Sequence, residues 1–546
     1  MYAREVRSLS NLVVGFFAEG KGQLELTQRM VALRSMVYTN GTARALLLAD
    51  TACALVKRRI GNSARECLPR YSGVTAEAWE PALRKRSFMK ELWPAQRLLG
   101  ERRVFAGASA VVQMPTSAGK SRATEIAIRS AFLNGRASLA VVVAPFRALC
   151  NEIRDALVRA FAGEEVTVNQ LSDVIQPDVA VQELTAGLTI VVVTPEKLVY
   201  LLRHAPSLAK EIGLLVLDEG HQFDTGTRGV TYELLVTSLK QMIPAQAQKI
   251  LISAVISNAY QIGEWLNGAE GEVVVGRDLL PTERSVAFAS WQTQVGQLHF
   301  VDPEDPDHEE FFVPRVIRSQ QLARKPRERK DRFFPTRNDS QSVGLYLALS
   351  MARVGAVALF CGRKDSVVGL CEDVLDHFER QVQLRKPLEA SDPREMERIG
   401  YLFERHLGSD AAAARAAKIG VLTHHGNTPH GARLAVEHAM KKGFGRFVIC
   451  TSTLAQGVNL PIRYLVVTTT RQGGEKIKVR DFHNLIGRAG RSGMHSEGTV
   501  IFADPEIYDT RAARDGIGRG VARYRASGPS PPSSFQTVRA DFPHTA

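Results

Sequence analysis

The stretch Met114-Pro-Thr-Ser-Ala-Gly-Lys-Ser121 follows an apolar run, residues 110–112, and opens a helical pattern. In a loop between a strand and a helix, backbone N–H groups and the helix N-terminus can face a phosphate. Lys120 would add a mobile positive charge near the β and γ phosphates, and Ser121 would offer a hydroxyl to Mg²⁺. Met114 stands where such loops usually begin with glycine, so a tight strand-to-helix turn is the alternative. The stretch predicts a nucleoside triphosphate site.

Around this loop, short β-branched runs alternate with helical stretches, which is typical of a parallel sheet covered by helices on both faces. Ligands of such sheets bind beyond the carboxyl ends of the strands, so the segments that follow the runs should meet on one surface. The runs are residues 110–112, 139–143, 188–193, 214–217 and 250–252. The segments after them are the loop, Ala144-Pro-Phe-Arg147, Thr194-Pro-Glu-Lys197, Asp218-Glu-Gly-His221 and Ser253-Ala-Val255.

A second series of runs repeats the plan and predicts a second α/β domain, without a phosphate loop of its own. It comprises residues 356–360, 419–422, 447–450, 464–467 and 499–502, and Gly487-Arg-Ala-Gly-Arg491 precedes the last run. Arg488 and Arg491 are three residues apart, so on a helix start they could form a fork around γ-phosphate oxygens. The alternative is that these arginines bind surface carboxylates.

The fold class expected from these patterns is α/β, with two tandem parallel-sheet domains and a helical N-terminal segment. We expect a helical accessory segment at 1–85, a first domain at 86–290, a charged insertion or linker at 291–342, a second domain at 343–512 and a tail at 513–546. The linker holds an acidic cluster, residues 302–310, and a basic run, residues 324–332, which we interpret as solvated. Metal binding by the acidic cluster is the less favoured alternative.

The composition suits a large globular protein with a polyanionic partner. The 546 residues are 45% apolar, which suggests three or four domains, and the net charge is +13. Charge alone does not separate nucleic acid from an acidic protein or a membrane surface. No apolar run approaches the roughly 18 residues of a membrane span, so we expect a cytoplasmic protein without membrane association. The six cysteines form no CxxC pair, which favours buried thiols over zinc ligands or disulfides.

Asp218 and Glu219 follow a buried run and suit a Walker B arrangement. Mg²⁺ keeps several waters, so Asp218, through water, and the hydroxyl of Ser121 would be enough to hold it. Glu219 could then orient or deprotonate the attacking water. An acidic cap on the next helix is the alternative reading of the pair.

Eight motifs occur in order between residues 92 and 502: PTSAGKS, APFRALCNE, TPEKL, DEGH, SAV, HHG, TSTLAQGVNLP and GRAGR. This set resembles the superfamily 2 DExH helicases. More narrowly it resembles their Ski-like branch, which includes archaeal DNA-repair helicases, exosome-associated RNA helicases and spliceosomal helicases. The resemblance implies two RecA-like domains, ATP and Mg²⁺ as cofactors, and 3′-to-5′ travel along nucleic acid.

The resemblance also assigns roles to residues by their place in the motifs. ATP contacts fall on Gln96, Thr116, Ser117, Ala118, Gly119, Lys120, Ser121, Gly457 and Asn459, and catalysis on Lys120, Asp218, Glu219, His221, Arg488 and Arg491. Ser121 and Asp218 fall at the metal. Contacts to one nucleic-acid strand fall on Pro145, Arg147, Thr194, Pro195, Thr451 and Ser452, and coupling of hydrolysis to movement on His221, Ser253, Ala254 and Val255.

Three positions depart from the family pattern. Gly220 stands where Ala, Val or Ile is usual, and its missing side chain should leave ion binding intact. Val255 replaces a threonine, which removes one hydroxyl and predicts weaker coupling, and Asn484 replaces a glutamine. Members of this branch continue into a winged-helix domain and a helical ratchet domain, and we expect this chain to lack both, which puts strand separation in doubt.

The sequence thus predicts an ATP-dependent helicase or translocase acting on single-stranded DNA or RNA. DNA repair and antiviral defence both fall in the family's range, and a nuclease is the type of partner protein expected. Two alternatives stay open. The chain could be a nucleic-acid-stimulated ATPase that remodels protein–nucleic acid complexes without unwinding, or a catalytically dead scaffold that binds nucleic acid.

Overall fold

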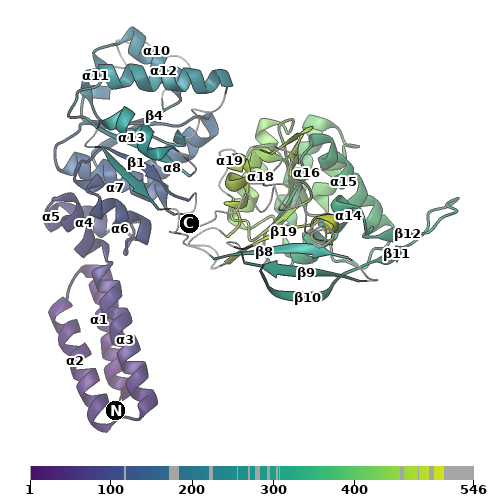
Figure 1. The fold of residues 1–546 in the computed structure, drawn as a ribbon, viewed down its shortest axis with the longest axis horizontal. Helices are drawn as coiled ribbons and strands as arrows, with labels where there is room; N and C mark the ends of the chain where they lie inside the picture. The colour runs from purple at the N-terminus through teal and green to yellow at the C-terminus, as the bar shows by residue number, and fades with distance from the viewer. Residues whose placement is uncertain are drawn as a thin grey trace, which may run out of the picture. The chain divides into compact units, whose positions relative to one another are not determined.

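The computed structural model describes most of the chain up to residue 509 and divides it into two compact units, Met1–Leu279 and Leu280–Ala546. Each unit contains its own β-sheet with helices around it (Figure 1). The described residues are 2–115, 118–170, 184–220, 226–254, 256, 258–268, 271–276, 279, 283–291, 295–302, 305, 308–454, 460–477, 479–490 and 497–509.

The first unit begins with three helices that lie side by side, α1 (Tyr2–Glu19), α2 (Gln23–Asn40) and α3 (Ala43–Gly61) (Figure 1). The links between them are two or three residues long, which makes neighbouring helices antiparallel. Phe16 and Leu33 are 1% exposed in a small core of their own, and the hydroxyl of Thr42 caps α3 by accepting from Ala45 N.

Next along the chain, α4 (Ala64–Ser72), α5 (Ala76–Leu83) and α6 (Pro94–Glu101) share the core of the first sheet. Trp79 is fully buried there, and its Nε1 donates to Ser72 Oγ. The expected helical segment at 1–85 is therefore helical, but only its first three helices have a separate core. A 3₁₀ turn, η1 (Val104–Ala106), leads into the sheet.

The first sheet is entirely parallel, with the order β3-β4-β2-β5-β6-β1-β7. Alternate residues of one strand enter two different cores, for example Ala110 and Val112 in one and Val111 in the other. Both faces are thus buried, as the continuous apolar runs predict. The strands are β1 (Ala110–Gln113), β2 (Leu139–Val143), β3 (Val166–Gln170), β4 (Leu188–Val193), β5 (Ile212–Leu217), β6 (Gln248–Ser253) and β7 (Glu272–Val275). The helices are α7 (Lys120–Leu133), α8 (Arg147–Phe161), α10 (Pro195–His204), α11 (Leu208–Glu211), α12 (Gly226–Met242) and α13 (Ala259–Asn267).

The second unit holds an eight-stranded sheet with the order β10-β9-β8-β19-β16-β13-β15-β14. Its central strands are parallel, and β9 and β10 add an antiparallel edge. The strands are β8 (Glu283–Ser290), β9 (Val295–Val301), β10 (Glu309–Arg318), β13 (Val357–Phe360), β14 (Val421–His424), β15 (Phe447–Cys450), β16 (Tyr464–Val467) and β19 (Glu497–Phe502). The helices are α14 (Ser340–Met351), α15 (Lys364–Glu379), α16 (Pro393–Leu407), α17 (Ala412–Lys418), α18 (His430–Lys442), α19 (Val479–Ile486) and α20 (Pro505–Asp509). Smaller elements are η3 (Pro387–Ala390), η4 (Ser452–Leu454) and the ribbons β11 (Gln320–Leu322) with β12 (Arg332–Phe334) and β17 (Arg471–Gln472) with β18 (Glu475–Lys476).

The start of this second sheet differs from the expected linker at 291–342. β8, β9 and β10 belong to the second sheet, so much of that segment is built into the second unit. The physical reason is visible in β8, where Phe288 enters one core and stacks on Phe502 at 4.8 Å, while Ala287 and Ala289 enter the other. In the described part of the chain, no helix has the length and apolar character needed to cross a membrane.

Candidate nucleotide-binding site and motif surfaces

The phosphate loop lies between the end of β1 and the start of α7. Met114 N donates to Ser253 O at 2.9 Å, which ties the loop to the end of β6. Gly119 has φ +87°, a left-handed conformation that glycine adopts without strain, and it directly precedes α7. A Cβ at Gly119 would lie 2.7 Å from Nε2 of Gln96. The left-handed backbone thus favours glycine at this position, and a side chain there would also displace the amide end of Gln96.

Lys120, the first residue of α7, has a buried side chain that is 9% exposed. Its Nζ lies 3.8 Å from Oε1 of Glu219 and makes no hydrogen bond within the described structure. A buried ammonium group without hydrogen bonds is costly, since it has given up its water. A phosphate at the N-terminus of α7 would supply those missing acceptors.

Asp218 and Glu219 follow β5 at the same end of the sheet. Asp218 N donates to Val143 O at 2.9 Å, which continues the pairing with β2, and Glu219 N donates to Asp218 Oδ1 at 2.9 Å. Glu219 has φ +53°, which is uncommon for a residue with a side chain and marks a strained backbone. The strained turn directs the Glu219 carboxylate toward Lys120.

Two further residues near this acidic pair escaped the sequence reading. Tyr232 of α12 is 2% exposed, and burial together with the charges of Asp218 and Glu219 raises its pKa well above the usual value, so it is a neutral phenol. Leu251 of β6 fills the space beside Gly220, where a Cβ would lie 2.2 Å from Leu251 Cδ2. The Leu251 side chain thus occupies the space that a side chain at Gly220 of the DEGH box would need.

Gln96 is 2% exposed and lies in the first turn of α6. Its Oε1 accepts from Trp93 N at 2.8 Å, and its Nε2 donates to Gly119 O at 3.5 Å. Gln96 therefore links the start of α6 to the phosphate loop. The ring of Trp93 also borders the loop, 3.4 Å from the position of a Gly119 Cβ, and no sequence motif pointed to it.

The expected strand-end residues of the first unit are neighbours on one edge. Pro145 and Arg147 follow β2, and Thr194 and Pro195 follow β4, which pairs with β2 in parallel. Arg147 is exposed, whereas Pro145, Thr194 and Pro195 are buried. Ser253 is fully buried at the end of β6, and Ala254 after it is half-buried.

In the second unit, Thr451 and Ser452 follow β15 and are buried. The HHG histidine His424 contacts Thr453 Oγ1 through Nδ1 at 3.2 Å and Glu437 Oε1 through Nε2 at 3.0 Å. His424 thus has a partner, Glu437, in α18. Among the described residues, no group of three or more His, Cys, Asp or Glu could hold a metal ion.

Arg488 is 8% exposed and follows α19, where its N donates to Leu485 O at 3.1 Å. Gly490 has φ +70° and lies against Gly498, whose Cβ would be 2.2 Å from Gly490 N. Seven expected site residues lie outside the described part of the chain: Thr116, Ser117, His221, Val255, Gly457, Asn459 and Arg491.

Family comparisons agree with this arrangement. The family model for DEAD/DEAH box helicases matches residues 93–262, and the model for the helicase conserved C-terminal domain matches residues 397–493. The chain thus has the two conserved domains of the superfamily 2 DExH-box helicases, which it resembles. In this helicase the first match contains the phosphate loop and the DEGH box, and the second contains Arg488. The α/β fold with two RecA-like domains and a helical N-terminus is confirmed.

Three similar proteins place this helicase among known relatives. It is 27% identical over 423 residues to the Hachiman protein HamB of Bacillus cereus, covering 77% of this chain and 37% of HamB. It is 26% identical over 431 residues to the ATP-dependent DNA helicase Hel308 of Pyrococcus horikoshii, covering 78% of this chain and 52% of Hel308. It is 25% identical over 434 residues to DNA polymerase theta of Drosophila melanogaster, covering 78% of this chain and 20% of the polymerase. The aligned part thus spans about half the length of Hel308 and less than half the length of HamB and of the polymerase.

Proposed function

We propose that this helicase binds ATP at the N-terminus of α7, hydrolyses it, and uses the hydrolysis to move along DNA. The observation that carries the proposal is the buried Lys120 ammonium facing Glu219 at the carboxyl ends of β1 and β5. A cation and an acid held together at the end of a parallel sheet, beside a left-handed glycine at the start of a helix, fit a triphosphate and its attacking water.

The side chains divide the work as follows. Lys120 neutralises charge on the β and γ phosphates, and Gln96 fixes the loop that holds them and reads the adenine. Glu219 accepts the proton of the attacking water. Asp218 and Ser121 offer the hard oxygen donors that Mg²⁺ prefers, and Ser121 is exposed. Bound Mg²⁺ would neutralise charge on the phosphate oxygens.

The second unit contributes Arg488 and Arg491, which we assign to the γ-phosphate. Charge builds on the phosphate oxygens during transfer, and arginines that reach them can contribute on the order of 10³ to 10⁵ in rate. Thr194, Ser452 and their neighbours at the strand ends are assigned to the nucleic-acid backbone.

DNA is the proposed track because two of the similar proteins are named as a DNA helicase and a DNA polymerase. The test is ATP turnover by the purified chain with single-stranded DNA, with single-stranded RNA and without nucleic acid. We expect stimulation by DNA above RNA. Turnover that no nucleic acid stimulates would overturn the motor, and no turnover at all would identify a scaffold. A parallel assay with a 3′-tailed duplex separates an unwinding enzyme from one that moves or remodels without unwinding.

A further inference from the structure

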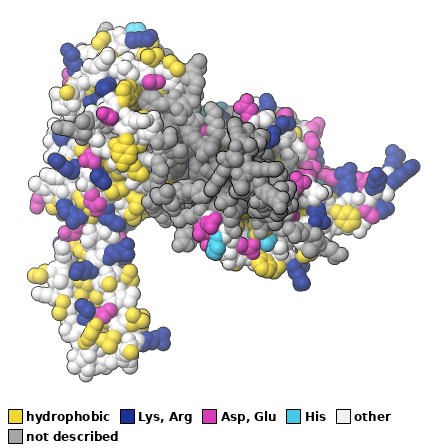
Figure 2. All heavy atoms as spheres, viewed as in Figure 1, with side chains coloured by type: hydrophobic (Ala, Val, Ile, Leu, Met, Phe, Trp, Pro, Cys, Tyr) yellow, Lys and Arg dark blue, Asp and Glu magenta, His cyan; other side chains and the backbone are white. Residues whose placement is uncertain are grey.

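A β-ribbon of the second unit carries a charged tip that the proposed motor does not use. β11 and β12 pair in antiparallel register, Gln320 with Phe334 and Leu322 with Arg332, and residues 323–331 join them. We call residues 320–334 the basic arm. Figure 1 shows the arm extending away from the sheet of its unit, and Figure 2 shows Lys and Arg side chains gathered at its far end.

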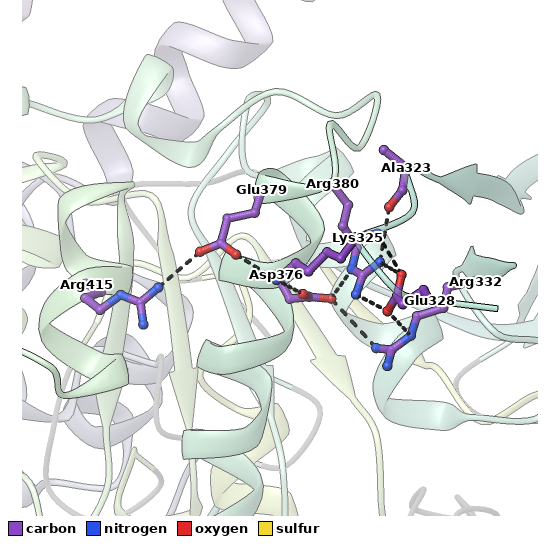
Figure 3. Close-up of polar contacts among 8 residues, drawn as sticks. All are labelled: Ala323, Lys325, Glu328, Arg332, Asp376, Glu379, Arg380 and Arg415. Carbon is purple, nitrogen blue, oxygen red and sulfur yellow. Dashed lines mark hydrogen bonds and ion pairs between the residues drawn. The ribbon is translucent and has the colours of Figure 1, made fainter. Parts of the chain in front are cut away.

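The loop of the arm, residues 323–331, is held against the end of α15 by a buried arginine (Figure 3). Arg380 is 4% exposed and donates to both oxygens of Glu328, each at 2.6 Å, and to Asp376 Oδ2 at 2.6 Å. Its Nη1 also donates to Ala323 O at 3.1 Å. The paired geometry holds the pKa of Glu328 at about 2, so that carboxylate is ionised throughout the physiological range. The arm is therefore a fixed projection of the unit.

The other acidic side chains near the arm are also paired with Lys or Arg side chains. Lys325 Nζ lies 2.6 Å from Asp376 Oδ1 and 2.8 Å from Glu379 Oε2. Further pairs are Arg324 with Asp331 at 2.6 Å, Arg332 with Glu328 at 3.4 Å and Arg415 with Glu379 at 3.2 Å. Arg324, Lys325 and Arg332 of the arm thus pair with acidic groups of the arm itself and of α15.

The tip is a tight turn with an unusual residue. Glu328 N donates to Lys325 O at 3.1 Å, and Lys325 N donates to Glu328 Oε2 at 2.8 Å. Pro326 takes the second position, and Arg327, the third, has φ +74°, as in a type II turn. Glycine or asparagine is the usual residue at that third position, so the needs of the turn do not account for an arginine there.

Three cations at this tip have no acidic partner among the residues that the structure describes. Arg327, Arg329 and Lys330 are exposed and occupy three of four consecutive positions. Phe333, further along the arm, is 54% exposed. Clustered cations on an arm that also exposes an aromatic ring suit phosphates and stacked bases, whereas an acidic protein partner gives no reason for the ring.

We infer that the basic arm binds the phosphate backbone of nucleic acid through Arg327, Arg329 and Lys330, with Phe333 available for a base. The inference rests on the proposed function in taking nucleic acid as the polyanionic partner of this chain. Because the arm is already held by Arg380 and Lys325, binding does not need to order it, which removes part of the entropic cost.

The test is the salt dependence of binding by the full chain, measured without ATP by fluorescence anisotropy of labelled single-stranded DNA. The arm variant is R327A/R329A/K330A. The matched control is R353A/R394A/K442A, which removes three exposed cations elsewhere in the same unit and changes the net charge equally. Loss of three phosphate contacts should reduce the slope of log K against log salt by about 2, with at least roughly tenfold weaker binding near 0.1 M salt.

The control should keep most of the wild-type slope, and R327K/R329K should restore it because the charges remain. Equal slopes for the wild type and the arm variant would overturn the inference. So would loss of binding to poly-glutamate by the arm variant with an unchanged DNA slope, which would make the arm a protein-binding surface. If the wild type binds DNA through the basic arm but hydrolyses no ATP, the inference about the arm holds and only the proposed ATP-driven movement is rejected.

Discussion

Nζ of Lys120 lies 3.8 Å from Oε1 of Glu219, and both side chains are largely buried at the end of the first sheet. The pair places two opposite charges beside the proposed phosphate site. Removing the lysine charge and removing the glutamate charge should therefore change nucleotide affinity in opposite directions. Lys120→Ala removes the attraction to phosphate and should weaken ATP binding by on the order of tenfold to a hundredfold. Glu219→Gln removes repulsion and should leave binding equal or tighter.

Both variants should lose hydrolysis, by about 10² to 10⁴ for the glutamine. Binding is measured with a fluorescent ATP analogue, and turnover by phosphate release. The exposed Arg122→Ala in the same helix controls for general effects on α7, because it removes a cation without touching the pair. Normal turnover in Glu219→Gln would reject the assignment of that acid as the base.

Gly220 and Leu251 offer a test of packing beneath the same site. A Cβ at Gly220 would lie 2.2 Å from Leu251 Cδ2, so Gly220→Ala should cost about 1–3 kcal/mol through overpacking. Leu251→Ala alone should cost about 2–5 kcal/mol through the cavity that it leaves. The double variant should cost clearly less than the sum, since the new methyl enters that cavity. Urea unfolding of the four proteins measures the coupling, and strict additivity would contradict the contact.

The strand ends and the phosphate loop could be predicted from sequence because apolar runs, Gly119 and Lys120 act over a few neighbouring residues. The boundary at β8 could not, since Phe288 is specified by a partner, Phe502, that lies far along the chain. The same holds for the arm. Arg380 and Glu328 are 52 residues apart, and a charge run says nothing about which of its members are paired. Gln96 was predicted as a nucleotide contact, but its bonds to Trp93 N and Gly119 O depend on how α6 packs against the loop.

The anchor of the basic arm can be released by one substitution. Glu328→Gln removes the charge that Arg380 holds, so the arm should detach more often and trypsin should cut within 324–332 several-fold faster. Glu389→Gln is the control and should leave the cleavage rate unchanged, because it removes the charge from the exposed pair of Glu389 with Arg385 at 3.9 Å and keeps a side-chain oxygen that can accept from Lys386 N. Equal rates in the two variants would mean that the ion pair does not hold the arm.

The same anchor predicts a pH dependence with a definite sign. The hydrogen bonds from Arg380 lower the pKa of Glu328 from 4.5 to about 2, so its contribution to anchoring is complete above pH 4.5. It should be lost as the pH falls from 4.5 toward 2, because the carboxylate then takes up a proton. The protection of residues 320–334 from hydrogen exchange, corrected for the intrinsic pH dependence of the exchange rate, should fall over that range in the wild type. Protection in Glu328→Gln should already be low at pH 5 and should change little below it.

The reactivity of the six cysteines should report the order in which the parts of the chain unfold. All six are free and buried, and burial raises the pKa of Cys150 to about 11 and that of Cys361 to about 12. At pH 8 the native chain should therefore react slowly with a thiol reagent, and all six should react once guanidinium unfolds it. Cys53 belongs to the small core of α1, α2 and α3, which buries far fewer side chains than either sheet, so it should be labelled first at low denaturant. Mass spectrometry of the labelled peptides gives the order. The larger core of each sheet domain predicts that it opens less readily than the helical bundle. Labelling of Cys150 or Cys361 before Cys53 would contradict that prediction.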